Sequence, residues 1–252
     1  MEPTITQPKN ELLVQGSTHK LLLVCGILSS LLYVAMNLVA ALLYPGYNAL
    51  SQAVSELSAV DAPTRSIWLP LGFFYSFLVI AFGAGVWQSG VAMKPLKTIG
   101  LILMISGFVG LFWPPMHQRE VLAAGGGTLT DSLHIAFTMI IIPLMMAVMV
   151  ISATLFGKNF RIYTIVSLVV LVGSGVLTGL EAPHMQANEP TPLMGLWERI
   201  NIAAYMLWVI VFTMQLFRKE EKELLETEKR KGEVKIIGQK KTSIGPLHHG
   251  EN

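Results

Sequence analysis

The chain alternates between long apolar runs and shorter polar segments. Six runs stand out because each holds almost no charged side chain. A helix needs about 20 mainly apolar residues to cross the hydrocarbon core of a bilayer, and its backbone must satisfy its own hydrogen bonds there. The pattern therefore predicts an all-α integral membrane protein. The predicted spans are 21–43, 67–87, 95–113, 135–156, 162–180 and 200–217.

Loop lengths and composition favour one compact six-helix bundle over 21–217. Two of the connections, 88–97 and 157–161, are little more than turns, and short connections make neighbouring helices antiparallel and adjacent. Only 13% of the residues are charged, against about 25% in an average soluble domain. We predict a multi-pass protein of the cell membrane (plasma or inner membrane). A cytoplasmic tail over 1–20 precedes the bundle, and a charged cytoplasmic tail over 218–252, helical and then disordered, follows it.

Basic residues predict the orientation of the bundle. Cytoplasmic loops of membrane proteins carry an excess of Lys and Arg. If the N-terminus is inside and the spans alternate, fifteen of the 18 basic residues are cytoplasmic, and only Arg65, Arg119 and Arg199 lie outside. Both termini are therefore predicted to be cytoplasmic. The outer loops are longer and contain seven acidic residues, so the outer face is where side-chain chemistry is expected.

The first outer loop contains an amphipathic segment, "YNALSQAVSELSAVDAPTR". Apolar residues from Leu50 to Leu57 recur at i, i+3, i+4 and i+7, which is the spacing of one helical face. We predict a short amphipathic helix at the membrane interface, with Asn48 as its N-cap. Two roles fit this element: a lid that covers helix ends, or the wall of a pocket that Ser55 and Glu56 line.

Three histidines lie at predicted outer helix ends: His117, His134 and His184. Three imidazoles with an open fourth position form the ligand set of some catalytic zinc sites. A nearby carboxylate, Asp131 or Glu181, would then act as a general base or orient a ligand. Alternatively, the histidines are interfacial side chains with hydrogen-bonding roles, because their spacing is looser than that of a zinc-protease motif. Zinc is therefore the candidate cofactor, and the sequence leaves both alternatives open.

Glu198 and Arg199 open the last span. Adjacent helical residues do not face each other, so we expect Arg199 to pair with another outer-face carboxylate or with a lipid phosphate. Together with Ser55 and Glu56, these two residues are the candidate pocket residues.

Several functions have no support in the sequence. It contains no phosphate-binding loop, dinucleotide fingerprint or serine-hydrolase elbow, and Cys25 is its one cysteine. The basic residues are scattered, which gives no basis for nucleic-acid binding. No Asp, Glu, Lys or Arg lies deep in a span, which argues against a proton-coupled transporter. The expected partners are membrane lipids, and the sequence identifies no protein partner.

The segment "YPGYNALSQAVSELSAVDAPTR" resembles the signature of a bacterial and archaeal six-helix membrane family, catalogued as domain of unknown function 998. That family is distantly similar to the Frag1/DRAM/Sfk1 group of polytopic proteins. The histidines at the outer helix ends are also similar to the family pattern. The resemblance implies the six-helix plan over about residues 20–217, and it implies no activity or cofactor. The matching positions are Pro45, Gly46, Ser55, Glu56, Leu57 and Pro63.

Three functional hypotheses follow. The first is a binding or regulatory membrane protein whose outward-facing polar, His-rich pocket holds a lipid or another amphiphile. The second is a metal-dependent membrane hydrolase that uses the three outer-face histidines. The third is a transporter. We favour the first, because the metal motif is loose and the spans contain no deeply buried charge.

A reporter protein fused after Asn252 tests the orientation. It is expected in the cytoplasm, because the excess of basic residues places both termini there. An extracellular reporter would overturn this orientation.

Overall fold

The computed structural model describes residues 9–90 and 93–243, and side-chain surroundings within 18–90, 93–227 and 229–230. All regular secondary structure in these residues is helical, and six helices are long and apolar enough to cross a membrane. This confirms the predicted all-α six-helix membrane protein. The α-helices are α1 Lys9–Leu43, α2 Arg65–Ser89, α3 Lys94–Leu111, α4 Arg119–Ala123, α5 Leu129–Ser152, α6 Lys158–Gln186 and α7 Met194–Ser243, and a 3₁₀ helix, η1, covers Val54–Ser58.

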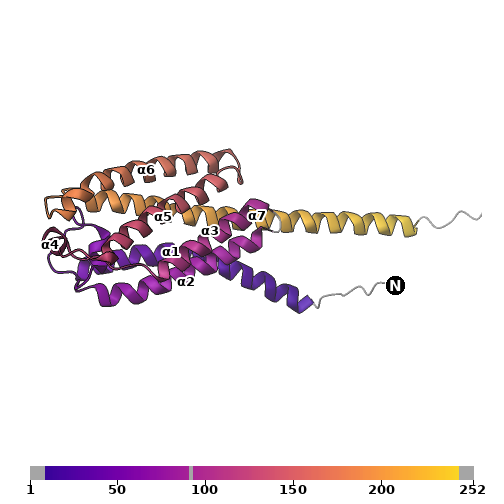
Figure 1. Ribbon diagram of the computed structural model, residues 1–252. Coiled ribbons are helices and arrows are strands. Elements are labelled where there is room, and N and C mark those ends of the chain that lie inside the picture. Colours follow the sequence, from indigo (N-terminus) through magenta and orange to yellow (C-terminus); the bar gives the residue numbers. More distant parts are fainter. Residues whose placement is uncertain (1–8, 91–92, 244–252) are drawn as a thin grey trace, which may run out of the picture. The chain divides into compact units, whose positions relative to one another are not determined.

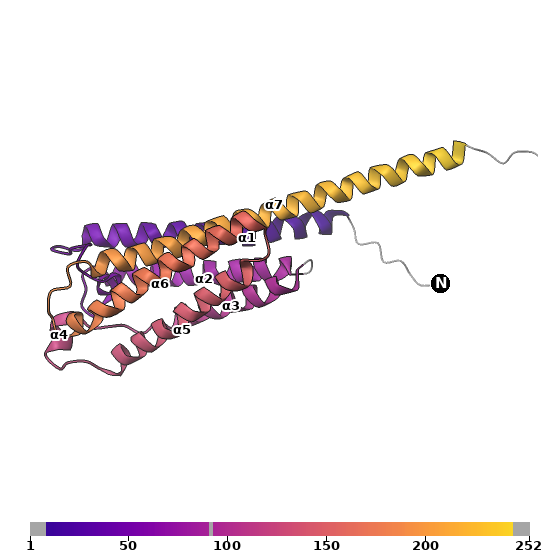
Figure 2. The ribbon, with the colours of Figure 1, turned by 90° about the horizontal axis from the view of Figure 1, so that it is seen from above.

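The chain forms two compact units, Met1–Thr213 and Met214–Asn252. In the first unit, the long helices run side by side (Figures 1 and 2), and the connections α1–α2, α3–α5 and α6–α7 gather at one end. We call this the capped end. In the second unit, α7 continues as far as Ser243. The predicted disordered end lies partly in residues 244–252, outside the described residues.

Small residues set the packing of α2 against α3. A Cβ atom on Gly100 would lie 2.5 Å from the backbone nitrogen of Trp87 and 2.6 Å from the carbonyl oxygen of Gly83. Glycine therefore lets the two backbones touch, as small residues commonly do between membrane helices. Aromatic side chains fill the space between α6 and α7, where the fully buried Trp208 donates from Nε1 to Thr164 Oγ1 at 3.1 Å.

Several helix ends differ from the predicted spans, and two of these differences affect candidate site residues and their neighbours. α3 ends at Leu111, so Trp113 belongs to the following loop. α6 continues through Pro183 to Gln186. Glu181 and His184 therefore lie in the last turns of this helix, whereas the sequence placed them just past the span.

Gly100→Ala is expected to lower the thermal unfolding midpoint of the protein in detergent. Alanine favours a helix over glycine by about 1 kcal/mol, but overpacking a close contact costs about 1–3 kcal/mol. The control is Gly173→Ala in α6, where a Cβ atom would meet nothing within 4 Å. Equal midpoints for the two variants would contradict the close approach of α2 and α3.

Candidate functional site at the capped end

The loop 44–64, which we call the roof, folds through local turns. The N–H of Tyr47 donates to the carbonyl of Tyr44 at 3.2 Å, and Gly46 between them has a φ of 78°. A type II turn needs such a positive φ, which is why Pro-Gly suits this corner. Asn48 Oδ1 then accepts from the N–H of Leu50 at 2.9 Å, so Asn48 stabilises a turn. The predicted amphipathic helix is thus shorter than its pattern suggests and is reduced to η1.

The underside of η1 is apolar and buried. Val54 is 2% exposed and Leu57 is fully buried, and both pack with Ala40 of α1. Trp68 of α2 and Ile202 of α7 pack against the same cluster. The roof therefore closes over three membrane helices at once.

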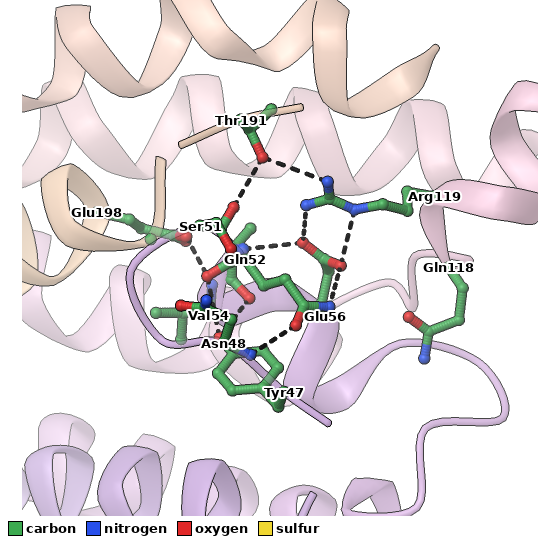
Figure 3. A network of polar contacts seen from close by, with 12 residues as sticks. Tyr47, Asn48, Ser51, Gln52, Val54, Glu56, Gln118, Arg119, Thr191 and Glu198 are labelled. Atoms are coloured by element: carbon green, nitrogen blue, oxygen red, sulfur yellow. Dashed lines mark hydrogen bonds and ion pairs between the residues drawn. The ribbon is translucent and has the colours of Figure 1, made fainter. Parts of the chain in front are cut away.

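Glu56 lies at the centre of the polar network above this cluster (Figure 3) and is 1% exposed. Arg119, the first residue of α4, donates from Nη2 to Glu56 Oε1 at 2.7 Å and from Nε to Oε2 at 3.1 Å. Its Nη1 donates to Thr191 Oγ1 at 3.2 Å. Two groups of the roof itself also donate to the Glu56 carboxylate, Gln52 Nε2 at 3.1 Å and the Ala53 N–H at 2.8 Å.

The pairing keeps both charges in place despite burial. The Arg119 side chain is 11% exposed. Burial lowers the pKa of Arg119, but the hydrogen bonds and the charge of Glu56 outweigh this effect, so the pKa lies above its ordinary value. Two-pronged Arg–carboxylate pairs are among the strongest hydrogen bonds in proteins. Because Thr191 Oγ1 also donates to the carbonyl of Ser51 at 2.7 Å, one arginine joins all three connections of the capped end.

Glu198 and Arg199 fasten the roof to α7. Glu198 Oε2 accepts from the N–H of Val54 at 2.6 Å. Arg199 donates from Nη1 to the carbonyl of Ala49 at 2.7 Å and from Nη2 to the Tyr47 hydroxyl at 2.8 Å. Burial raises the pKa of Tyr47 to about 12, so this hydroxyl stays protonated. Arg199 thus bonds to the roof backbone and a tyrosine, and not to the carboxylates that the sequence suggested.

Ser55 is the exception among the candidate pocket residues. It is half-buried, and it contributes its backbone carbonyl, which accepts from Ser58 Oγ at 3.2 Å. Its hydroxyl does not donate to the Glu56 carboxylate.

Asp131, in the first turn of α5, holds the loop that follows α3. Its carboxylate accepts from the N–H and from Nδ1 of His117, at 2.7 and 2.9 Å, and from the N–H of Thr128 at 2.7 Å. Asp131 and Thr128 form the capping box of α5, in which side chains satisfy the free N–H groups of the first turn. The Asp131 carboxylate is therefore bonded to His117, which lies fourteen residues before it in the chain.

The other two histidines have separate contacts. Nδ1 of the buried His134 donates to the carbonyl of Pro114 at 2.8 Å, and Nδ1 of the exposed His184 donates to Glu189 Oε2 at 2.6 Å. One oxygen of Glu181, Oε2, is buried and has no hydrogen-bond partner. Across the described residues, no three His, Cys, Asp or Glu side chains come close enough to hold a metal ion. The zinc ligand set predicted from the three histidines is thus not assembled in this structure.

Sequence reasoning missed Arg119, Gln52 and Thr191. The available signal was charge: Arg119 is one of only three basic residues predicted outside, among seven acidic ones. An unpaired arginine in such a loop points to a carboxylate partner, but the spacing of 63 residues to Glu56 gives no local pattern to identify it.

The fold and the capped end define a multi-pass membrane protein in which a folded loop closes one end of a helical bundle. More particularly, the chain belongs to the family described as "Protein of unknown function (DUF998)", whose model matches residues 27–215. The match includes the roof, whose sequence suggested this family. No curated protein and no solved structure matches the chain.

A double-mutant cycle on Glu56→Gln and Arg119→Gln tests the ion pair. Each single change is expected to lower the free energy of unfolding by about 3–5 kcal/mol, because it leaves a buried charge unpaired. The double variant should lose less than the sum by about 0.5–3 kcal/mol.

The matched control is Glu120→Gln, an exposed neighbour of Arg119, whose effect should stay within about 0.5 kcal/mol. Denaturant unfolding in detergent is measured for the wild type and all four variants. Strictly additive losses would show that the two side chains do not stabilise each other.

Proposed function

We propose that this protein binds a lipid or another amphiphile beneath its roof, in a non-catalytic or regulatory role. The observation that carries the proposal is the roof itself. Its apolar underside lies on three membrane helices, and a buried ion pair holds it from above. The function concerns the ends of the membrane helices that this element covers.

The contrast between the two ends of the bundle supports this proposal. Between α5 and α6, residues 153–157 suffice to connect two helices. The roof uses 21 residues, 44–64, between α1 and α2. A buried ion pair is weak evidence for added stability, because the desolvation of both charges opposes their attraction. The ion pair does, however, specify one closed geometry. When it separates, water solvates both charged groups well, which suits an element that opens and closes.

Aromatic residues at the roof suit an amphiphile. Tyr44 and Tyr47 stack with ring centroids 5.5 Å apart, and both pack on the apolar cluster that includes Trp68. Tyrosine and tryptophan favour the level of lipid headgroups, where one side is apolar and the other is wet. A ligand with an acyl chain and a polar head matches the apolar side and the wet side of this headgroup level.

The hydrolase alternative has less support. His117, His134 and His184 each direct Nδ1 to a different acceptor, and their separate contacts do not form one reaction centre. The transporter alternative gains no observation in its favour.

Lipid exchange tests the proposal. Protein purified in mild detergent is expected to retain phospholipid that native mass spectrometry detects, and to exchange it for deuterated phospholipid. Arg119→Lys keeps the charge but loses the planar fork, so the roof should open more often and exchange should be several times faster. Arg161→Lys, an exposed arginine in α6, is the matched control. Wild-type protein that neither retains nor takes up any amphiphile would refute the proposed function.

A further inference from the structure

Asn37 is a buried polar residue with an unsatisfied donor. It lies in α1, is 7% exposed, and its amide nitrogen, Nδ2, has no hydrogen-bond partner. An unpaired buried donor loses its hydration without compensation, at a cost of about 1–3 kcal/mol. Native structures contain few such groups, and each calls for an explanation such as a bound molecule.

Asn37 lies one helical turn along α1 from Ala40, the residue that packs against the roof. Ala40, three residues further along α1, packs with Val54 and Leu57 of η1, and residues three apart share a helical face. Asn37 lies six residues before the end of α1 at Leu43, which corresponds to about 9 Å along the helix axis. Measured from a helix end at headgroup level, such a depth reaches the boundary between the interfacial region and the hydrocarbon core.

Tyrosines surround the next turn of the same face. Tyr33, four residues before Asn37, packs against Tyr75 of α2 with ring centroids 5.0 Å apart. Tyr33 also meets Trp68 edge-on at 6.2 Å, and Trp68 belongs to the cluster under the roof. Asn37 is therefore bracketed by the roof cluster on one side and by two tyrosines on the other.

α7 completes this group of side chains. Tyr205 is 7% exposed and interacts electrostatically with Tyr75. Glu198 interacts electrostatically with Tyr33. Glu198, Ile202 and Tyr205 recur at i, i+4 and i+7, which is one face of α7. Three helices thus contribute an amide and tyrosines to one region of the bundle, and Glu198 and Arg199 lie where this region meets the roof.

We propose that the Asn37 amide, together with the adjacent tyrosines, binds the ester carbonyl of an acyl lipid that enters beneath the roof. This inference rests on the proposed function and names the ligand chemistry of the same site. Nδ2 only donates hydrogen bonds, so its partner must be an acceptor. An ester carbonyl is an uncharged acceptor, and in a glycerolipid it lies between the headgroup and the acyl chains.

Charge argues against a phosphate at this position. Phosphates are typically bound by Arg, Lys or several backbone N–H groups. Arg199, the cation nearest this region, is already bonded to the roof at Ala49 and Tyr47. A neutral acceptor is the chemistry that these side chains accommodate.

A comparison of matched lipids tests the inference on the full-length protein in detergent. The probes are a diester phosphatidylglycerol and its diether analogue, which lacks both carbonyls. The wild type is expected to bind the diester about two to ten times more tightly, which corresponds to one neutral hydrogen bond. In Asn37→Leu this preference should disappear.

The control is Asn201→Leu. Asn201 already donates from Nδ2 to the carbonyl of Leu171 at 2.6 Å, so this change should lower the unfolding midpoint and leave the diester preference intact. Asn37→Leu, in contrast, should keep or raise the lipid-free midpoint, because it removes an unsatisfied buried donor. This result would exclude misfolding as the cause of a lost preference.

The outcomes separate the two proposals. If the wild type binds both lipids equally, or if Asn37→Leu keeps the diester preference, the inference is overturned and amphiphile binding beneath the roof stands. If neither lipid binds the wild type, the proposed function itself fails.

Discussion

A bilayer offers no hydrogen-bond partners to a chain that crosses it, and this constraint determines where polar chemistry is found in this protein. The spans satisfy their backbones as helices, and most of their hydroxyl side chains bond within the same helix. Ser106 Oγ donates to the carbonyl of Ile102, and Thr138 Oγ1 donates to the carbonyl of His134, each four residues back. Such groups add no free donor to the helix surface. Charged networks are therefore found where the helices end and the loops begin.

At the capped end, the three connections depend on one another because they share acceptors. Glu56 takes hydrogen bonds from its own loop and from Arg119, and Arg119 reaches Thr191 in the third connection. The backbone of the roof also lies very close to that of α7. A Cβ atom on Gly195 would lie within 3 Å of two roof carbonyl oxygens, those of Gln52 and Ala49. Packing from below and polar bonds from above thus select the same roof geometry.

The sequence predicts the fold well because apolar length is a local property. All six spans follow from runs of about 20 residues, and the family follows from the roof segment. The site is less predictable because its bonds join residues far apart in the chain. Helical periodicity from Leu50 to Leu57 predicts a longer amphipathic helix than η1. The Pro-Gly turn and Asn48 instead fold the first part of the loop, and Leu50 remains 54% exposed. The three histidines at the outer helix ends suggested a metal, but carboxylates and a backbone carbonyl bind their imidazoles instead.

Glu56 and Asn37 differ in the cost of their burial: a buried carboxylate needs a cation, whereas a buried amide does not. A carboxylate at the position of Asn37 would need a cation, and a buried pair there would face the full desolvation cost of both ions. An amide costs far less to leave unpaired and still donates with a fixed geometry. Leucine would pack in its place without any such cost. An asparagine beneath a closed roof therefore makes physical sense under the proposal that an acceptor enters that region when the charged bonds above it open.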